Sequence, residues 1–276
     1  MNICLNTKFL FIITSQKKVE DRFFYDAEHY IKAILEKGGS TDNIIVATDS
    51  SSTMVCAKCP AMQGVIFISS EQVLSMITAL NCDNLIILAD CHGSLFGIDS
   101  PQPIGPYALT EAIKNNKSVT NVIVLFGQCF SGIYNGVDLR DDDKNIVYIG
   151  ATGFDSSFSY KLPTTTWFTN ISLMAFRNWI INPIDIDGDG AFTVMDLYKY
   201  IAWFTTSIVH ELEKIYTSLF IDAKVKQELA KKFQEKSPDM MEQLKKEAVE
   251  VLGNYTIPHQ VPWILNAFSA QRIIFE

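Results

Sequence analysis

The stretch Asn121-Val-Ile-Val-Leu-Phe-Gly-Gln-Cys-Phe-Ser-Gly132 decides the fold. Its first half, Val122 to Phe126, is an apolar run with the length and β-branched content typical of a buried parallel strand. The run stops at Gly127, and Cys129 follows, flanked by small residues that leave the backbone room to turn. Reactive groups gather at the carboxyl ends of the strands in an open parallel sheet, so we expect Cys129 to be placed for chemistry.

A second stretch is built in the same way. The apolar run Leu85–Ala89 leads into Asp90-Cys-His-Gly-Ser94, so His92 also follows the end of a strand. If the two strands are neighbours, His92 and Cys129 face each other across one crevice, and a thiol needs such a base to become a thiolate. The backbone N–H groups of Gly93 and Cys129 can then bind a developing oxyanion. The alternative is that Cys129 is a small buried apolar residue and His92 a hydrogen-bonded loop histidine.

Other runs of the same kind alternate with helical segments along the chain. Strands are predicted at 9–14, 44–48, 85–89, 122–126, 146–150 and 271–275, and helices at about 22–37, 70–80 and 166–181 and from Pro106 onward. This alternation predicts an α/β fold with a mostly parallel, six-stranded sheet flanked by helices. The chain is expected to divide into a core over 1–200, a helical insertion over 201–255 before the last strand, and a final strand within 256–276 that returns to the core.

An acidic loop, Asp185-Ile-Asp-Gly-Asp-Gly-Ala-Phe-Thr-Val-Met-Asp196, has the spacing of a calcium-binding loop. Its expected ligands are three aspartates at positions one, three and five, a carbonyl at seven and a carboxylate at twelve, namely Asp185, Asp187, Asp189, Ala191 and Asp196. Oxygen ligands at this density suit Ca²⁺ better than zinc, which predicts a structural calcium ion. The alternative is an ordinary solvated acidic turn.

A strand followed by His-Gly, and later a strand followed by Cys-x-Ser-Gly, resembles the legumain-like cysteine peptidases of the caspase-like fold. Arg22 and Asp26 at the start of the first predicted helix resemble the opening of that helix in these enzymes. The stretch Ile149-Gly-Ala-Thr-Gly-Phe-Asp-Ser-Ser157 is similar to the segment that follows the nucleophile there. The calcium-type loop is similar to those of EF-hands and dockerins, although Asp closes it where an EF-hand has Glu.

The resemblance implies a hydrolase, a thiol protease with a His92–Cys129 dyad and an oxyanion site at Gly93 and Cys129. It implies cleavage after Asn or Asp, because Arg22 only donates hydrogen bonds and suits a carbonyl or carboxylate side chain. Further substrate-binding residues are expected at Gln128, Asp155 and Ser157. Glu20 stands where a legumain has the Asn that orients the histidine, and a carboxylate can accept the other imidazole N–H. A transamidase or ligase on the same scaffold, or a catalytically silent binding module, remain alternatives.

Composition sets the expected partners and compartment. The chain has 276 residues and a formal net charge of −8, which argues against nucleic acid as a partner. No apolar stretch reaches the length of a membrane span. The run Phe9–Ile13 is too short for a signal-peptide core, so a cytoplasmic protein, or one exported without a cleaved signal, is expected. We expect a protein or peptide substrate and no organic cofactor. The oligomeric state is left open.

Overall fold

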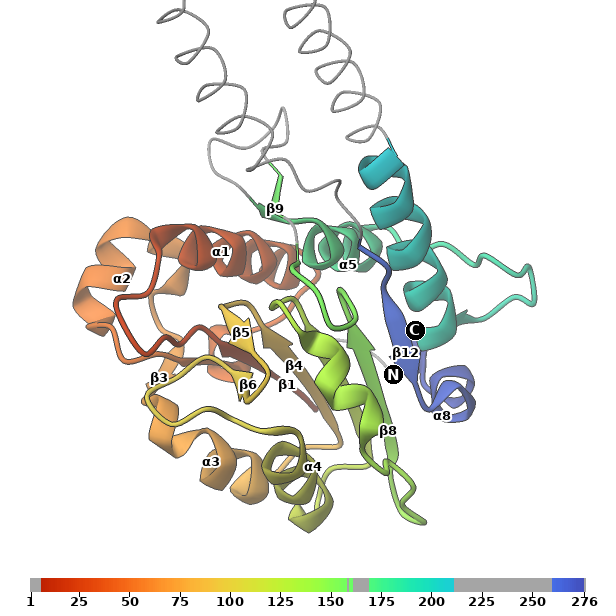
Figure 1. Ribbon diagram of the computed structural model, residues 1–276, viewed down its shortest axis with the longest axis horizontal. Coiled ribbons are helices and arrows are strands. Elements are labelled where there is room, and N and C mark those ends of the chain that lie inside the picture. Colours follow the sequence, from red (N-terminus) through yellow and green to blue (C-terminus); the bar gives the residue numbers. More distant parts are fainter. Residues whose placement is uncertain (1–5, 158, 161–168, 211–259, 276) are drawn as a thin grey trace, which may run out of the picture. The chain divides into compact units, whose positions relative to one another are not determined.

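The computed structural model describes residues 6–157, 159–160, 169–210 and 260–275. Its centre is a seven-stranded sheet, drawn as arrows in Figure 1. In spatial order the strands are β3 (Ile66–Ile68), β2 (Ile44–Ala47), β1 (Thr7–Ile12), β4 (Asn84–Ala89), β7 (Asn121–Phe126), β8 (Asn145–Gly150) and β12 (Trp263–Leu265). All neighbouring pairs are parallel except β12 with β8, which are antiparallel.

Helices cover both faces of this sheet (Figure 1). One face packs against α1 (Asp21–Glu36) and α5 (Ile171–Ile181), and the other against α3 (Val73–Ala79) and α4 (Pro106–Asn115). Residues along each strand alternate between the two apolar cores, so Phe11 lies in the first and Leu10 in the second. The predicted mostly parallel α/β sheet flanked by helices is therefore confirmed.

Shorter elements complete the described chain. They are α2 (Ser52–Lys58), α8 (Ala267–Arg272), the 3-10 turns η1 (Thr41–Asn43), η2 (Pro60–Met62), η3 (Ser70–Gln72) and η4 (Ser131–Gly136), and three two-stranded pairs: β5 (Gly93–Ser94) with β6 (Gly97–Ile98), β9 (Ser159–Tyr160) with β10 (Thr169–Asn170), and β11 (Phe192–Thr193) with β13 (Ile274–Phe275). A further helix starts at residue 194. Among the described residues, no helix is both long and apolar enough to cross a bilayer.

The prediction for the last strand is wrong. The residues of the predicted strand 271–275 instead complete α8 and form β13, which pairs with β11 outside the main sheet. The strand that joins the sheet is β12, which takes the place of the predicted last strand. The count rises from six to seven because β3 was not among the predicted strands. The Trp263 indole decides this placement: a Cβ on Gly150 of β8 would overlap its ring, and Trp263 Nε1 donates to the Thr152 carbonyl at 2.7 Å.

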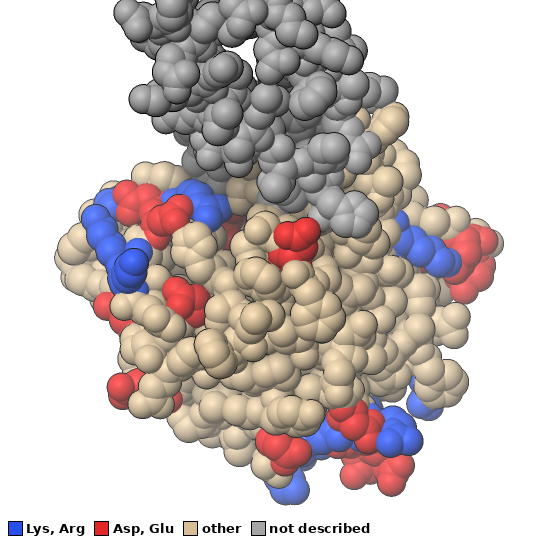
Figure 2. Space-filling view, in the orientation of Figure 1, with Lys and Arg blue, Asp and Glu red and all other residues tan. Residues whose placement is uncertain are grey.

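Contacts divide the chain into two units, one formed by 1–205 with 260–276 and the other by 206–259. The predicted helical insertion over 201–255 is helical at 201–210, and its remaining residues lie outside the described part of the chain. On the face shown in Figure 2, charged side chains of both signs gather at the left, right and lower margins, and a few acidic side chains stand apart nearer the centre.

Candidate functional site at the carboxyl edge of the sheet

The strand order reverses between β1 and β4, because the chain first builds outward to β3 and then continues on the other side of β1. Ligands of open α/β sheets bind outside the carboxyl ends of the strands at such a reversal. Glu20 and Arg22 follow β1 at the start of α1, and His92 follows β4. The next strand is β7, with Ala89 paired to Phe126, so Cys129 follows the neighbouring strand as expected.

His92 and Cys91 point in opposite directions. The Cys91 thiol is buried in the second core, and burial raises its pKa, whereas the His92 side chain is 47% exposed. The imidazole stands edge-on to the Phe23 ring, with the two centroids 5.3 Å apart. Its Nε2 lies 2.6 Å from Glu20 Oε1. Because a carboxylate only accepts hydrogen bonds, Nε2 carries the hydrogen of this bond, and Nδ1 is the ring atom left for proton transfer.

Glu20 joins the histidine to Arg22. Its Oε2 accepts from Arg22 Nε at 2.7 Å, and the hydrogen bond from Arg22 is the largest cause that lowers the pKa of Glu20. Burial opposes this shift, and the hydrogen bond from His92 adds to it. Arg22 Nη1 also donates to Ser159 Oγ at 2.7 Å. The cationic residue expected to bind substrate therefore lies in one hydrogen-bonded chain with the candidate base.

Cys129 lies in a sharp turn that is fastened to the loop after β8. The next residue, Phe130, has a left-handed backbone with φ of 56°, which is rare for a residue with a side chain. Phe130 N donates to the Asp155 carbonyl at 2.8 Å, and Ser131 Oγ donates to the Thr152 carbonyl at 2.5 Å. These bonds join the strained turn to the loop after β8, and Cys129 is half-buried.

One backbone amide points at the thiol. Ser157 N donates to Cys129 Sγ at 3.3 Å, and Ser157 Oγ donates to the Gly127 carbonyl at 2.6 Å. Gly93 packs against the same turn from β5, so closely that a Cβ at this position would overlap the Cys129 carbonyl oxygen. The His-Gly and Cys-x-Ser-Gly segments are therefore in contact through Gly93.

Other expected site residues lie around this turn. The Gln128 side chain is 1% exposed, beneath Gly93, and neither of its amide atoms has a hydrogen-bond partner among the described residues. Asp155 is exposed, and its Oδ1 accepts from Ser156 N at 2.7 Å. Two residues of the site were not predicted from the sequence: Asn170, which contacts Ser157, and Ser159, which contacts Arg22. The only signal for Asn170 is its place as the polar residue before the apolar run of α5.

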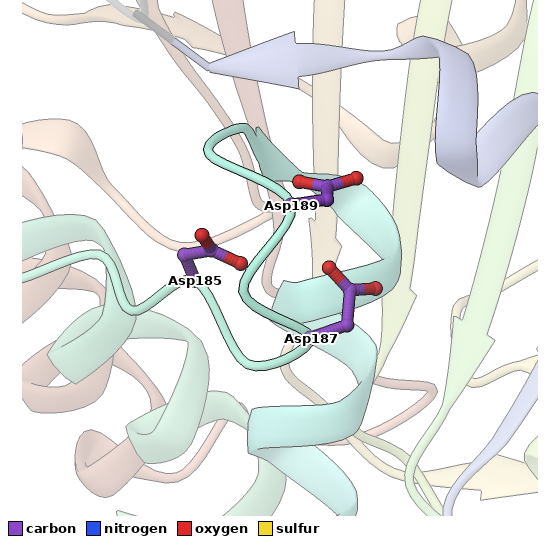
Figure 3. A group of neighbouring side chains, drawn as sticks. All are labelled: Asp185, Asp187 and Asp189. Carbon is purple, nitrogen blue, oxygen red and sulfur yellow. The ribbon is translucent and has the colours of Figure 1, made fainter.

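The acidic loop brings together three of its five expected ligands. Carboxylate oxygens of Asp185, Asp187 and Asp189 lie within 4.8 Å of one another. Figure 3 shows the three side chains on the same loop. The Lys199 ammonium is 2.5 Å from Asp187 Oδ2, so a side-chain cation already neutralises one member. Asp196, the expected closing ligand, is fully buried and is not a member of this group of three carboxylates.

Asp196 accepts hydrogen bonds from its own loop. Its Oδ1 accepts from Ile186 N at 3.0 Å, and its Oδ2 accepts from Thr193 N at 2.9 Å and Thr193 Oγ1 at 2.7 Å. Burial works to raise the pKa of Asp196, but these hydrogen bonds outweigh it and lower the pKa below its usual value. This carboxylate stabilises the start of the helix at residue 194, because it accepts hydrogen bonds from the residue that precedes the helix.

Comparisons with known proteins bring in a different class of enzyme. No family model matches the chain, and no curated protein matches it. Among solved structures, the chain aligns with pyrroline carboxylate reductase from Plasmodium falciparum with NADP bound, at 16% identity and a TM-score of 0.29. The alignment covers 54% of this chain and 44% of the reductase chain, which is less than half the length of that protein.

These comparisons correct the family assignment. The aligned structure is a reductase and no family model or curated protein matches, so we withdraw the legumain-like thiol protease, the cleavage after Asn or Asp, and the two alternatives on that scaffold. The expectation of no organic cofactor belonged to the peptidase prediction and is withdrawn with it; the aligned reductase holds NADP. The predicted calcium ion is withdrawn too, because the carboxylate of its expected closing ligand, Asp196, accepts hydrogen bonds from the backbone N–H groups of Ile186 and Thr193. A TM-score of 0.29 carries neither NADP nor reductase activity to this chain.

Proposed function

We propose that the carboxyl edge of the sheet is a reactive-thiol site, at which Cys129 forms a covalent bond with an electrophilic carbon of a bound ligand. The observation that carries this proposal is the Ser157 N–H directed at Cys129 Sγ at 3.3 Å. A hydrogen-bond donor aimed at sulfur favours the thiolate, which is the nucleophilic form. The proposal concerns addition to carbon and includes no cleavage of peptide bonds.

The neighbouring groups have complementary roles in such an addition. His92 Nδ1 takes the thiol proton while Glu20 holds Nε2. The sulfur lone pair forms the C–S bond, and the π electrons of the ligand carbonyl move to its oxygen. The N–H groups of Gly93 and Cys129 bind that oxyanion, which is then protonated by His92. The product is a hemithioacetal-type adduct, so atoms and electrons balance without an added oxidant or reductant.

Arg22 sets the expected chemistry of the ligand. Its guanidinium is about one-quarter exposed and presents only donors, so it suits an oxygen acceptor such as a carboxylate or carbonyl group. Asp155 and Ser157 belong to the loop that lines the thiol, and they would flank the ligand on the opposite side. We therefore infer a small carbonyl compound with a second oxygen-bearing group as the ligand class.

Alkylation kinetics test the proposal. Iodoacetamide should modify Cys129 faster in the folded chain than in the chain unfolded in urea, and His92→Ala should slow this reaction about 100-fold. The internal reference is Cys59, a buried thiol whose pKa burial raises to about 12 and which should react only after unfolding. Equal rates for Cys129 in the folded and unfolded chain, measured by peptide mass mapping, would rule out a reactive-thiol site.

A further inference from the structure

Asn170 uses every hydrogen-bonding group of its side chain at a point where four elements meet. It is the residue before α5 and is 4% exposed. Its Oδ1 accepts from Leu173 N at 3.1 Å, which caps α5. Its Nδ2 donates to the Gly127 carbonyl at 2.7 Å and to Ser157 Oγ at 2.7 Å. Its backbone N–H donates to Asp26 Oδ2, on α1, at 3.2 Å.

These contacts lead to the thiol from two sides. Gly127 is two residues before Cys129, and its carbonyl receives both the Asn170 amide and the Ser157 hydroxyl. Ser157 in turn directs its backbone N–H at Cys129 Sγ. The Asn170 side chain thus fixes the distance between the end of β7 and the loop after β8. That distance determines whether the Ser157 N–H reaches the sulfur.

We propose that Asn170 is a positioning residue for the Cys129 thiol, which it serves by holding Ser157 and Gly127 so that the Ser157 amide points at the sulfur. This inference rests on the reactive-thiol site proposed above. It assigns Asn170 no contact with ligand. Its effect on the thiol passes through one hydrogen bond, so it should appear in the pH dependence of Cys129 reactivity.

The test compares variants that separate capping from positioning. Asn170→Ser keeps an oxygen that can cap α5 but removes the two Nδ2 donors. The matched control is Asn116→Ser at the opposite edge of the sheet. Asn116 is also buried and makes four side-chain hydrogen bonds, to Ile77, Leu80, Ser118 and Val119. Ser157→Ala removes only the hydroxyl that bonds to Gly127 and Asn170, and it replaces Asn170→Ser in the test if that variant does not fold.

The rate of iodoacetamide labelling at Cys129 is measured across pH for each variant, beside a urea unfolding curve. Asn170→Ser should move the midpoint of the pH profile upward by about one unit, a tenfold loss of thiolate below the midpoint. Ser157→Ala should move it in the same direction by less, and Asn116→Ser should only lower stability. A midpoint unchanged by Asn170→Ser, or moved equally by Asn116→Ser, overturns the positioning role alone. A wild-type Cys129 no more reactive folded than unfolded overturns the thiol site and this inference together.

Discussion

Gly93→Ala should disable the thiol site by a simple steric effect. A Cβ at Gly93 would lie within 3.0 Å of the Cys129 carbonyl oxygen and of two carbons of the Gln128 side chain, a separation that real Cβ atoms essentially never show. The carbonyl is backbone, and the Gln128 side chain is buried, so neither can yield without moving the turn. Restoring ordinary contact displaces the Cys129 backbone by about 1 Å.

The size of the effect follows from that displacement. Overpacking of this kind costs about 1–3 kcal/mol of unfolding free energy. A shift of about 1 Å in a reacting group costs about 100-fold in rate. The assays are urea unfolding and the iodoacetamide rate at Cys129. Gly136→Ala on η4 is the matched control, because its Cβ would meet nothing within 4 Å. It should match the wild type in the alkylation rate and at least match it in stability. If Gly93→Ala behaves like Gly136→Ala in both assays, the close packing of the two segments has no bearing on the thiol.

Variants at three other positions test the charges and the edge of the fold. Burial, with a further contribution from the neighbouring Asp26, raises the pKa of Asp90 well above its usual value, so the wild type should lose stability as pH rises above about 4, where the unfolded carboxyl ionises. Asp90→Asn removes that loss, so the difference in unfolding free energy should grow in its favour between pH 4 and 8, and a constant difference would contradict this. Asp196→Ala should cost about 1–3 kcal/mol in a chelating buffer, because the donors of Thr193 lose their acceptor; full stability would show that this carboxylate caps nothing. Trp263→Ala should cost about 2–3 kcal/mol and Trp263→Phe about 1 kcal/mol, measured in urea, whereas equal losses would mean that the indole ring adds nothing beyond its N–H bond.

The central strands could be predicted because their signal is local. The runs Leu85–Ala89 and Val122–Phe126 are apolar on both faces, which is the pattern of a strand buried between two helical layers. Once both strands are placed, the parallel arrangement brings the residues after them to one edge of the sheet. The opposite orientations of Cys91 and His92 were expected from alternation along a strand, but both residues lie in the loop between β4 and β5.

The remaining features depend on fit between distant residues. Trp263–Leu265 and Ile273–Phe275 are equally short apolar runs, so the sequence does not distinguish them. The first joins the sheet because the Trp263 indole packs on Gly150. The role of Asn170 depends on Gly127 and Ser157, which lie 43 and 13 residues away in the sequence. The acidic loop shows that spacing alone does not define a ligand set, because Asp196 turns toward protein donors.

The antiparallel strand β12 has a consequence for how the chain folds as it is synthesised. Trp263 and its acceptor Thr152 are 111 residues apart, so β8 is made long before the strand that covers its edge. At about 5–20 residues per second, a ribosome needs roughly 6–22 s to bridge that interval. During this time β8 presents unpaired backbone groups to any other extended chain nearby. The nascent chain therefore passes through a period in which association with other chains competes with closure of its own sheet.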